Sequence, residues 1–234
     1  MEILNIENIT KSFDGKKIID NISFSIKKGR IVGLLGINGS GKTTILKLIN
    51  DLLTLDSGKI TIMGEKVSEK SKAMVSFLPE RPYFDTCLNI KQTFDYFEDF
   101  YADFDRKKAE NLLKDLDLTL DMGLSKMSKG MKEKLQLILV MSRKAKLYIL
   151  DEPLGGVDPA TRDYILKTII SNFDENSSVL ITTHLISDVE KILDDVVIIN
   201  KGKVLVSSSC DVLREKEKAS INDIFRRIVK WLEN

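Results

Sequence analysis

RIVGLLGINGSGKTTILKLIN, residues 30–50, combines an apolar run, a glycine-rich loop and an amphipathic segment. Residues 31–35 are apolar and predict a buried strand. Residues 36–43 fit the pattern G-x-x-x-x-G-K-[ST] at every position. The apolar residues from Ile45 to Ile49 then predict a helix. Strand, loop and helix in this order are the context that a phosphate-binding loop requires, which makes a chance glycine-rich turn a poor alternative.

The chemistry of this loop follows from its residue types. Glycines let backbone N–H groups converge on phosphate oxygens, and the positive end of the following helix faces the same anion. Lys42 can reach the β- and γ-phosphates of a nucleotide, and the Thr43 hydroxyl can bind Mg²⁺. The residues that we expect to bind nucleotide here are Gly36, Asn38, Gly39, Ser40, Gly41, Lys42, Thr43 and Thr44.

Composition limits the classes of function. The 234 residues include 36 Lys and Arg against 35 Asp and Glu, so no basic bias indicates a nucleic-acid partner. A hydrophobic content of 43% is enough for a buried core. No apolar run approaches the roughly 18–20 residues that span a bilayer, and we expect no signal peptide. Cys87 and Cys210 lack metal-ligand spacing and are expected to be reduced thiols in a cytosolic protein.

A second apolar run, residues 147–150, ends in two carboxylates, Asp151 and Glu152. An Asp at the end of a strand beside a phosphate loop can hold Mg²⁺, and the next carboxylate can polarise an attacking water. By itself such a pair is more often a solvated turn. Beside the phosphate loop, it predicts Asp151 as a metal ligand and Glu152 as a general base.

Two further stretches contain candidate site residues. Ser128 is a good N-cap for the helix predicted after it, and Gly130 allows close backbone approach, so this turn can bind an anion or simply begin a helix. His184 is the only histidine, and it follows a strand-like run at 178–183. It is either a stray surface residue or a functional imidazole.

With these motifs in this order, the chain resembles the nucleotide-binding subunit of an ABC transporter. The resemblance extends from the first strand to about residue 210. It implies that Ser128 and Gly130 belong to the signature turn, which contacts the γ-phosphate held by a partner subunit. Asp158 matches the aspartate loop at the dimer interface, and His184 matches the histidine that contacts the γ-phosphate and the attacking water. Phe13 matches the aromatic residue that stacks on adenine; the alternative is a core aromatic on a hairpin.

The chain departs from the family pattern at two places. The usual Leu-Ser-Gly-Gly-Gln reads Met-Ser-Lys-Gly-Met at 127–131, so Lys129 either adds positive charge near the γ-phosphate or faces solvent. Glu80 stands where most members have glutamine; a carboxylate can still meet Mg²⁺ or water, but it adds negative charge near phosphate. Both variants resemble those of bacterial exporter ATPases in the drug- and antibiotic-resistance branch.

Two further stretches of the sequence are amphipathic. Phe94, Phe97, Tyr101 and Phe104 are spaced as one helical stripe, either a small core or, with Tyr83 and Phe84, a groove for a membrane partner. The tail at 220–233 predicts a helix that begins in a loose capping box of Ser220 and Asp223. Its apolar face, which runs from Ile221 to Leu232, is expected to dock on the parent domain, with binding to an anionic membrane as the alternative.

The sequence thus predicts one α/β domain over 1–234, a P-loop NTPase of the ABC type. We expect a mainly parallel sheet, a small antiparallel part near 1–30 and 58–66, and a helical subdomain over about 83–140. The expected function is hydrolysis of Mg²⁺-ATP by a homodimer or heterodimer at the cytoplasmic face of the membrane, which powers export by a separate permease. The alternative is a regulatory switch on a cell-envelope or division complex. A chromosome-type ATPase is excluded because no long coiled coil separates the motifs.

Overall fold

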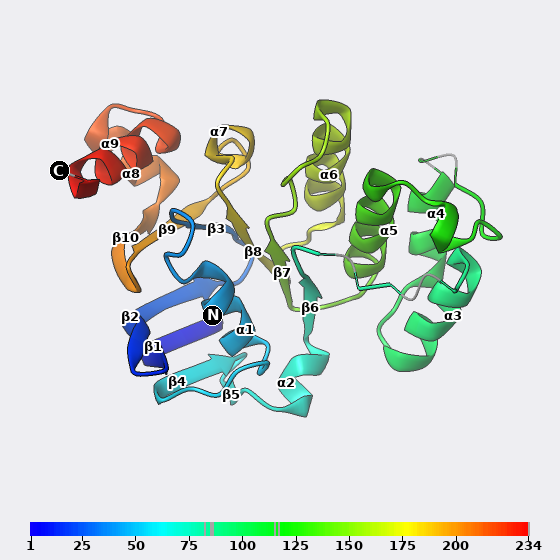
Figure 1. Cartoon of the computed structure of the whole chain (residues 1–234), viewed down its shortest axis with the longest axis horizontal. Coiled ribbons are helices and arrows are strands. Elements are labelled where there is room, and N and C mark those ends of the chain that lie inside the picture. Colours follow the sequence, from blue (N-terminus) through cyan, green and yellow to red (C-terminus); the bar gives the residue numbers. More distant parts are fainter. Residues whose placement is uncertain (82, 85–86, 115, 117, 234) are drawn as a thin grey trace.

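The structure, a computed structural model, describes residues 1–81, 83–84, 87–114, 116 and 118–233 and contains two sheets (Figure 1). An antiparallel sheet has the order β2-β1-β4-β5, from β1 (Glu2–Phe13), β2 (Lys16–Lys27), β4 (Ser57–Ile62) and β5 (Glu65–Lys66). The larger sheet has the order β10-β9-β3-β8-β7-β6, from β3 (Ile31–Leu35), β6 (Val75–Leu78), β7 (Leu147–Asp151), β8 (Ser178–Thr183), β9 (Asp195–Asn200) and β10 (Lys203–Ser209). Its neighbours are parallel except β10, which is antiparallel to β9. The predicted fold class is confirmed.

The larger sheet is buried on both faces, which explains the continuous apolar runs of its central strands. Along β7, Leu147 and Ile149 point into a core shared with the antiparallel sheet and α1 (Lys42–Ile49). Tyr148 and Leu150 point into the opposite core, which α5 (Lys129–Met141) and α6 (Pro159–Asn172) cover. Since fully burying one such side chain contributes about 1.5–3 kcal/mol, the two cores hold the strands firmly in register.

A third core lies at the far end of the molecule, among α3 (Ile90–Phe100), α4 (Arg106–Lys114), α5 and a 3₁₀ turn (Leu124–Lys126) (Figure 1). The short α2 (Glu69–Ala73) lies beside β6. Phe94 and Phe97 are buried in it, as the predicted stripe requires. The helix ends at Phe100, so Tyr101 and Phe104 lie beyond it and the single helical stripe is wrong at that end. Their rings still pack on Phe97, at centroid distances of 5.4 and 5.7 Å.

The end of the chain forms α7 (Ile186–Val189), α8 (Cys210–Glu217) and α9 (Ile221–Glu233). The Ser220 hydroxyl accepts a hydrogen bond from the Asp223 backbone N–H at 3.0 Å, which caps α9 as predicted. Ile221 and Ile224 are buried, so α9 docks on its own chain, while Trp231 is exposed. The side chain of Leu232 lies outside the described part. No helix in the described ranges has the length and apolar character needed to cross a bilayer.

The topology brings three loops to one edge of the larger sheet. β3, β8 and β7 are adjacent and parallel, so their carboxyl ends lie side by side. Residues 36–43 follow β3, Glu152 follows β7, and His184 follows β8. Ligands of open α/β sheets bind at this edge, outside the carboxyl ends of the strands.

Candidate functional site

The loop between β3 and α1 needs its glycines for close packing. Gly41 adopts φ 107° at the N-cap of α1, and a Cβ there would lie 2.6 Å from Ile19 Cδ1. A Cβ on Gly36 would lie 2.7 Å from the Ile199 carbonyl oxygen. The first turn of α1 contains no acidic residue, so its unpaired backbone N–H groups present positive potential. The loop is therefore shaped to hold an anion.

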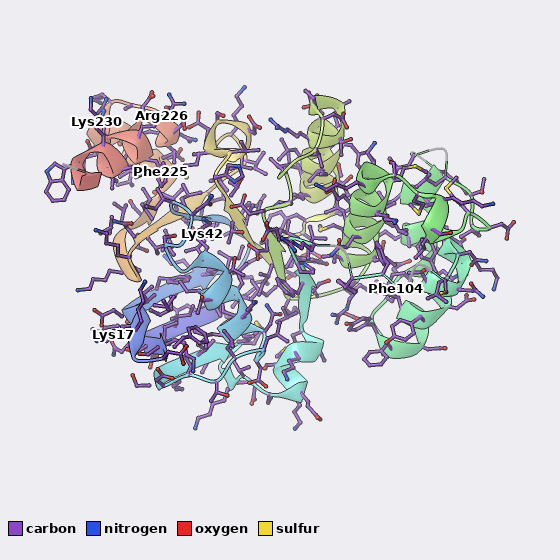
Figure 2. All side chains as sticks on the ribbon, in the orientation of Figure 1. Lys17, Lys42, Phe104, Phe225, Arg226 and Lys230 are labelled. Atoms are coloured by element: carbon purple, nitrogen blue, oxygen red, sulfur yellow. The ribbon has the colours of Figure 1, made fainter. Side chains whose placement is uncertain are left out.

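Lys42 is the cation at the centre of this edge (Figure 2), and its side chain is only 7% exposed. Its Nζ donates hydrogen bonds to the carbonyl oxygens of Gly36, at 2.8 Å, and Ile37, at 3.4 Å. Glu152 Oε1 lies 3.8 Å from the same nitrogen. Burial lowers the pKa of Lys42, and the nearby carboxylates, Glu152 foremost, act against that shift. A phosphate would provide this amine with a stronger partner than two carbonyl groups.

Asp151 ends β7 and is buried. The Thr182 hydroxyl, directly opposite on β8, donates a hydrogen bond to Asp151 Oδ1 at 2.6 Å. Burial raises the pKa of Asp151, and the hydrogen bonds from Thr182 and Thr43 offset part of that rise. The carboxylate is thus short of positive charge, which a cation would supply.

Glu152 adopts φ 49°, which is uncommon for a residue other than glycine. Its backbone N–H donates to the Thr182 carbonyl oxygen at 3.1 Å, which fixes the turn. Its Oε2 lies 2.8 Å from His184 Nδ1 and accepts a hydrogen bond from the His184 backbone N–H at 3.2 Å. One carboxylate therefore bridges Lys42 and His184, which come from loops far apart in the sequence.

These groups line one cavity of about 920 Å³. Of the predicted site residues, its wall contains Phe13, Asn38, Gly39, Gly41, Lys42, Thr43, Thr44, Glu80, Glu152 and His184. Asp151 lies just behind it, in a small adjoining hollow that Glu80 and Glu152 also line. Five further wall residues were not predicted from the sequence: Ile18, Arg81, Glu133, Gly155 and Gly156. Most of them lie within a few residues of a predicted motif, and that proximity is the only signal that could have found them.

Six predicted residues are not part of the cavity wall. Gly36 and Ser40 belong to the phosphate loop itself and Asp151 lies just behind the wall, whereas the other three lie at the starts of helices. Ser128 caps α5, where its hydroxyl accepts a hydrogen bond from the Met131 backbone N–H at 3.2 Å, and Gly130 lies in the first turn of that helix. Asp158 caps α6 and accepts two hydrogen bonds from Thr161, at 3.0 and 2.6 Å. Lys129 does reach the cavity wall. Within this one chain, Ser128, Gly130 and Asp158 therefore lie outside the cavity wall.

The oxygen donors at the site suit Mg²⁺. No group of three or more His, Cys, Asp or Glu side chains in the described ranges could hold a metal ion by itself. Mg²⁺ commonly takes only one or two carboxylates and completes its shell with waters and substrate phosphates. Asp151 and the Thr43 hydroxyl interact with each other and provide such a partial set. The buried Ser40 hydroxyl, which has no hydrogen-bond partner among the described atoms, is a further oxygen at the loop.

Comparison with known proteins agrees with this geometry. A family model described as "ABC transporter" matches residues 19–155, more than half of the chain. The chain belongs to the ABC transporter family. Among curated ABC proteins, YtrB of Bacillus subtilis, an ABC transporter ATP-binding protein, is 31% identical over 92% of this chain and 74% of its own length. The linearmycin resistance ATP-binding protein LnrL of the same organism is 32% identical, over 87% of this chain and 68% of its own length.

Solved ABC structures share the fold. The ATP-binding subunit of an ABC transporter superposes with a TM-score of 0.88 at 24% identity and covers 97% of this chain and 99% of its own. A bacterial Atm1-family ABC exporter with ATP bound gives 0.82 at 19% identity, covering 97% of this chain and 42% of its own. The chain is thus an ATP-binding, ATP-hydrolysing ABC protein. ATP-binding subunits of ABC transporters dimerise and work with membrane components.

Proposed function

We propose that this chain hydrolyses Mg²⁺-ATP in a head-to-tail dimer and thereby powers export by a separate membrane permease, from the cytoplasmic face of the membrane. The observation that carries the proposal is the convergence of Lys42, Glu152 and His184 in one cavity at the carboxyl edge of the larger sheet. A cation for phosphate, a carboxylate and an imidazole in mutual contact are the parts that nucleotide hydrolysis needs.

The phosphate side of the reaction belongs to the loop at 36–44. Its backbone N–H groups and the N-terminus of α1 bind the phosphate oxygens. Lys42 exchanges its bonds to the Gly36 and Ile37 carbonyls for the β- and γ-phosphates. Thr43 and Asp151 would hold Mg²⁺, with Glu80 at the adjoining wall, and the ion when bound neutralises charge on the phosphates. Most of the rate enhancement then comes from positioning and charge stabilisation.

The water side of the reaction belongs to Glu152 and His184. Glu152 takes the proton of the attacking water, because its carboxylate faces the cavity and is fixed at both ends by Lys42 and His184. His184 is an exposed residue of the cavity wall and orients the water and the γ-phosphate. Removing either contact leaves the base free to turn away from its substrate.

The dimer explains the positions of three predicted residues at helix starts, outside the wall of this cavity. Ser128, Gly130 and Asp158 lie at the starts of α5 and α6 and are not in the cavity wall of their own chain. A second ABC subunit, identical or related, would bring its turn at 128–130 to the nucleotide held here. Phe13, in the cavity wall, would stack on the adenine.

The permease is proposed to bind in the α3 groove, which we define as the hollow of about 650 Å³ lined by Leu52, Phe77, Tyr83, Phe97, Phe100, Tyr101 and Arg143 among others. Phe100 is 68% exposed and stacks on exposed Tyr96 with ring centroids 5.5 Å apart. Exposed aromatic side chains beside a hollow are typical anchors for a partner. Export, as the direction of transport, is supported by a further relative, the Nod factor export ATP-binding protein I of Sinorhizobium fredii, which is 29% identical over 92% of this chain and 65% of its own length.

The Glu152→Gln variant tests this function. Loss of the proton acceptor should slow hydrolysis by about 10²–10⁴-fold without removing ATP binding. The variant should therefore elute as an ATP-bound dimer in gel filtration with Mg²⁺-ATP. Glu175→Gln, at an exposed position outside the cavity, is the matched control and should behave as wild type. A Glu152→Gln monomer that still turns over ATP would overturn both the role of the base and the dimer.

A further inference from the structure

The outer end of the β1–β2 hairpin carries Phe13 and is weakly supported by the sheet. Pairing of β1 with β4 ends at Thr10 and Ser57, whereas pairing with β2 continues to Phe13 and Lys16. Beyond Thr10 the hairpin is therefore only two strands wide. On the β2 side the hairpin is held by the Asp20 backbone N–H, which donates to the Gly202 carbonyl oxygen at 2.8 Å. Among the described residues, the β1 side, which carries Phe13, has no strand beside it there, and a two-stranded end is marginally stable, so the ring needs another support on that side.

Asp56, just before β4, provides that support. Its backbone N–H donates to the Thr10 carbonyl oxygen at 3.1 Å. Its Oδ2 accepts a hydrogen bond from the Ser12 backbone N–H at 2.6 Å, and its Oδ1 accepts one from Lys11 Nζ at 2.8 Å. The Lys11 bond, with Ser12 second, holds the pKa of Asp56 below its ordinary value. One carboxylate thus takes the place of the missing strand beside Lys11 and Ser12.

Lys11 links Asp56 to the Phe13 ring. Its Nζ lies over the Phe13 ring, 5.4 Å from the centroid. The Lys11 side chain is mostly covered, whereas Phe13 is 42% exposed and lines the nucleotide cavity. A cation over one face of an aromatic ring is attracted by its quadrupole and limits the rotation of the ring. The rest of the ring surface is left for a ligand.

We propose that Lys11 and Asp56 are positioning residues that hold Phe13 as the stacking platform for the adenine base of ATP. This rests on the proposed function, because it requires Phe13 to contact the base. Lys11 and Asp56 form a neutral pair at 2.8 Å, so their effect on distant phosphates is small. Their contribution is specific to binding of the base. The affinity for a ligand that has phosphates but no base should therefore not depend on them.

The test compares ATP with inorganic tripolyphosphate as an inhibitor. Lys11→Met keeps an apolar stem but removes the charge, and should raise the KM for ATP about two- to fivefold while leaving kcat and the tripolyphosphate Ki unchanged. Lys17→Met is the matched control, since Lys17 pairs with Asp20 at the same 2.8 Å on the same hairpin and does not line the cavity (Figure 2). It should leave all three constants as in wild type.

A double variant shows whether the effect passes through the ring. In a Phe13→Ala background, Lys11→Met should cause no further rise in the KM for ATP. Asp56→Asn keeps an acceptor for the Ser12 N–H but loses the charge, so its KM should fall between those of wild type and Lys11→Met. Because Lys11→Met keeps the apolar stem of this mostly covered side chain, it carries the test even where an Asp56 variant folds poorly.

The outcomes separate this inference from the function on which it rests. If Phe13→Ala raises the KM for ATP but Lys11→Met does not, the positioning role is wrong and the proposed site stands. If Phe13→Ala leaves the KM unchanged while Glu152→Gln still abolishes turnover, the platform itself is wrong and the hydrolytic site stands. Equal weakening of ATP and tripolyphosphate by Lys11→Met would make Lys11 a phosphate contact and overturn the inference.

Discussion

The nucleotide cavity and the α3 groove are hollows of similar size, about 920 and 650 Å³, with walls of opposite character. The cavity is walled by loops at one sheet edge. Its Lys42 and the adjoining Asp151 are buried and bonded to neighbouring groups, whereas Glu80 and His184 are exposed. The groove is walled largely by aromatic and aliphatic side chains, of which Phe100 stands out into solvent. Charge stabilisation needs groups that are fixed before the reaction, whereas partner binding needs apolar area that becomes buried on contact.

The largest loss of ATPase activity should come from removing the buried positive charge of the cavity. Lys42→Ala deletes the buried ammonium group and should lower kcat/KM for ATP by about 10²–10³-fold, the cost of losing one preorganised donor. Lys47→Ala, one turn further along α1 and exposed, is the control and should keep activity near wild type in a steady-state ATPase assay. Turnover that survives in Lys42→Ala would remove the assignment of the phosphate loop.

The α3 groove is tested by the effect of a substitution on protein stability. Arg143 is 4% exposed and donates to the carbonyl oxygens of Val75 and Ala73, each at 2.6 Å, and to Asp103 at 2.9 Å. Its guanidinium carbon also lies 4.0 Å from the centroid of the Tyr101 ring. Arg143→Met leaves these acceptors unpaired and should lower the free energy of unfolding by about 3 kcal/mol.

Urea denaturation measures this change. Lys144→Met is the neighbouring control, because Lys144 is exposed and pairs with Asp105 at 3.4 Å. Its loss should cost less than about 1 kcal/mol. Equal midpoints for the Arg143 and Lys144 variants would show that the groove does not depend on Arg143 for its shape.

Substitution of Asp151 should change stability less than substitution of Arg143 does, and should raise it rather than lower it. Because burial raises the pKa of Asp151, the folded protein binds a proton there more tightly than the unfolded chain, and stability falls as the pH rises from about the ordinary value of 3.8. Asp151→Asn removes this cost and should raise the melting temperature of the nucleotide-free protein by a few degrees at pH 7, while abolishing Mg²⁺-dependent turnover.

The pH dependence provides the check. Scanning calorimetry should find the variant and wild type equally stable at acid pH, where Asp151 is protonated in both states. The advantage of the variant should appear as the pH rises. If the wild-type protein is instead more stable than the variant at neutral pH, the buried Asp151 carboxylate does not destabilise the nucleotide-free protein.

The smallest effect should come from Glu80, which is exposed at the cavity wall. Its negative charge also acts on Asp151, where it raises the pKa. Glu80→Gln should shift the Mg²⁺ concentration for half-maximal ATPase activity by about two- to threefold, with kcat unchanged. An unchanged Mg²⁺ titration would place Glu80 outside the reach of the metal.

The parts that sequence reasoning could predict are the local ones. The glycine pattern and the flanking periodicity located β3, the phosphate loop and α1, since each depends on residues within a few positions. The contacts that hold the site together are distant in sequence: Thr182 to Asp151, Asp56 to Ser12 and Arg143 to Val75 are separated by 31, 44 and 68 positions. None has a periodic signature. The misjudged stripe has a related cause, since Tyr101 and Phe104 reach the aromatic core by a turn rather than by helical spacing.

Helix α5 has a consequence for both hollows, because it touches each of them with a different end. Lys129 in its first turn lines the cavity, and Val140 near its last turn lines the groove. Its thirteen residues, at a rise of 1.5 Å each, form a helix about 20 Å long. If this helix tilts as a rigid body, both of its ends move. Any ligand of the groove that tilts this helix must change the affinity for nucleotide, and thermodynamic linkage then requires nucleotide to change the affinity of that ligand by the same factor.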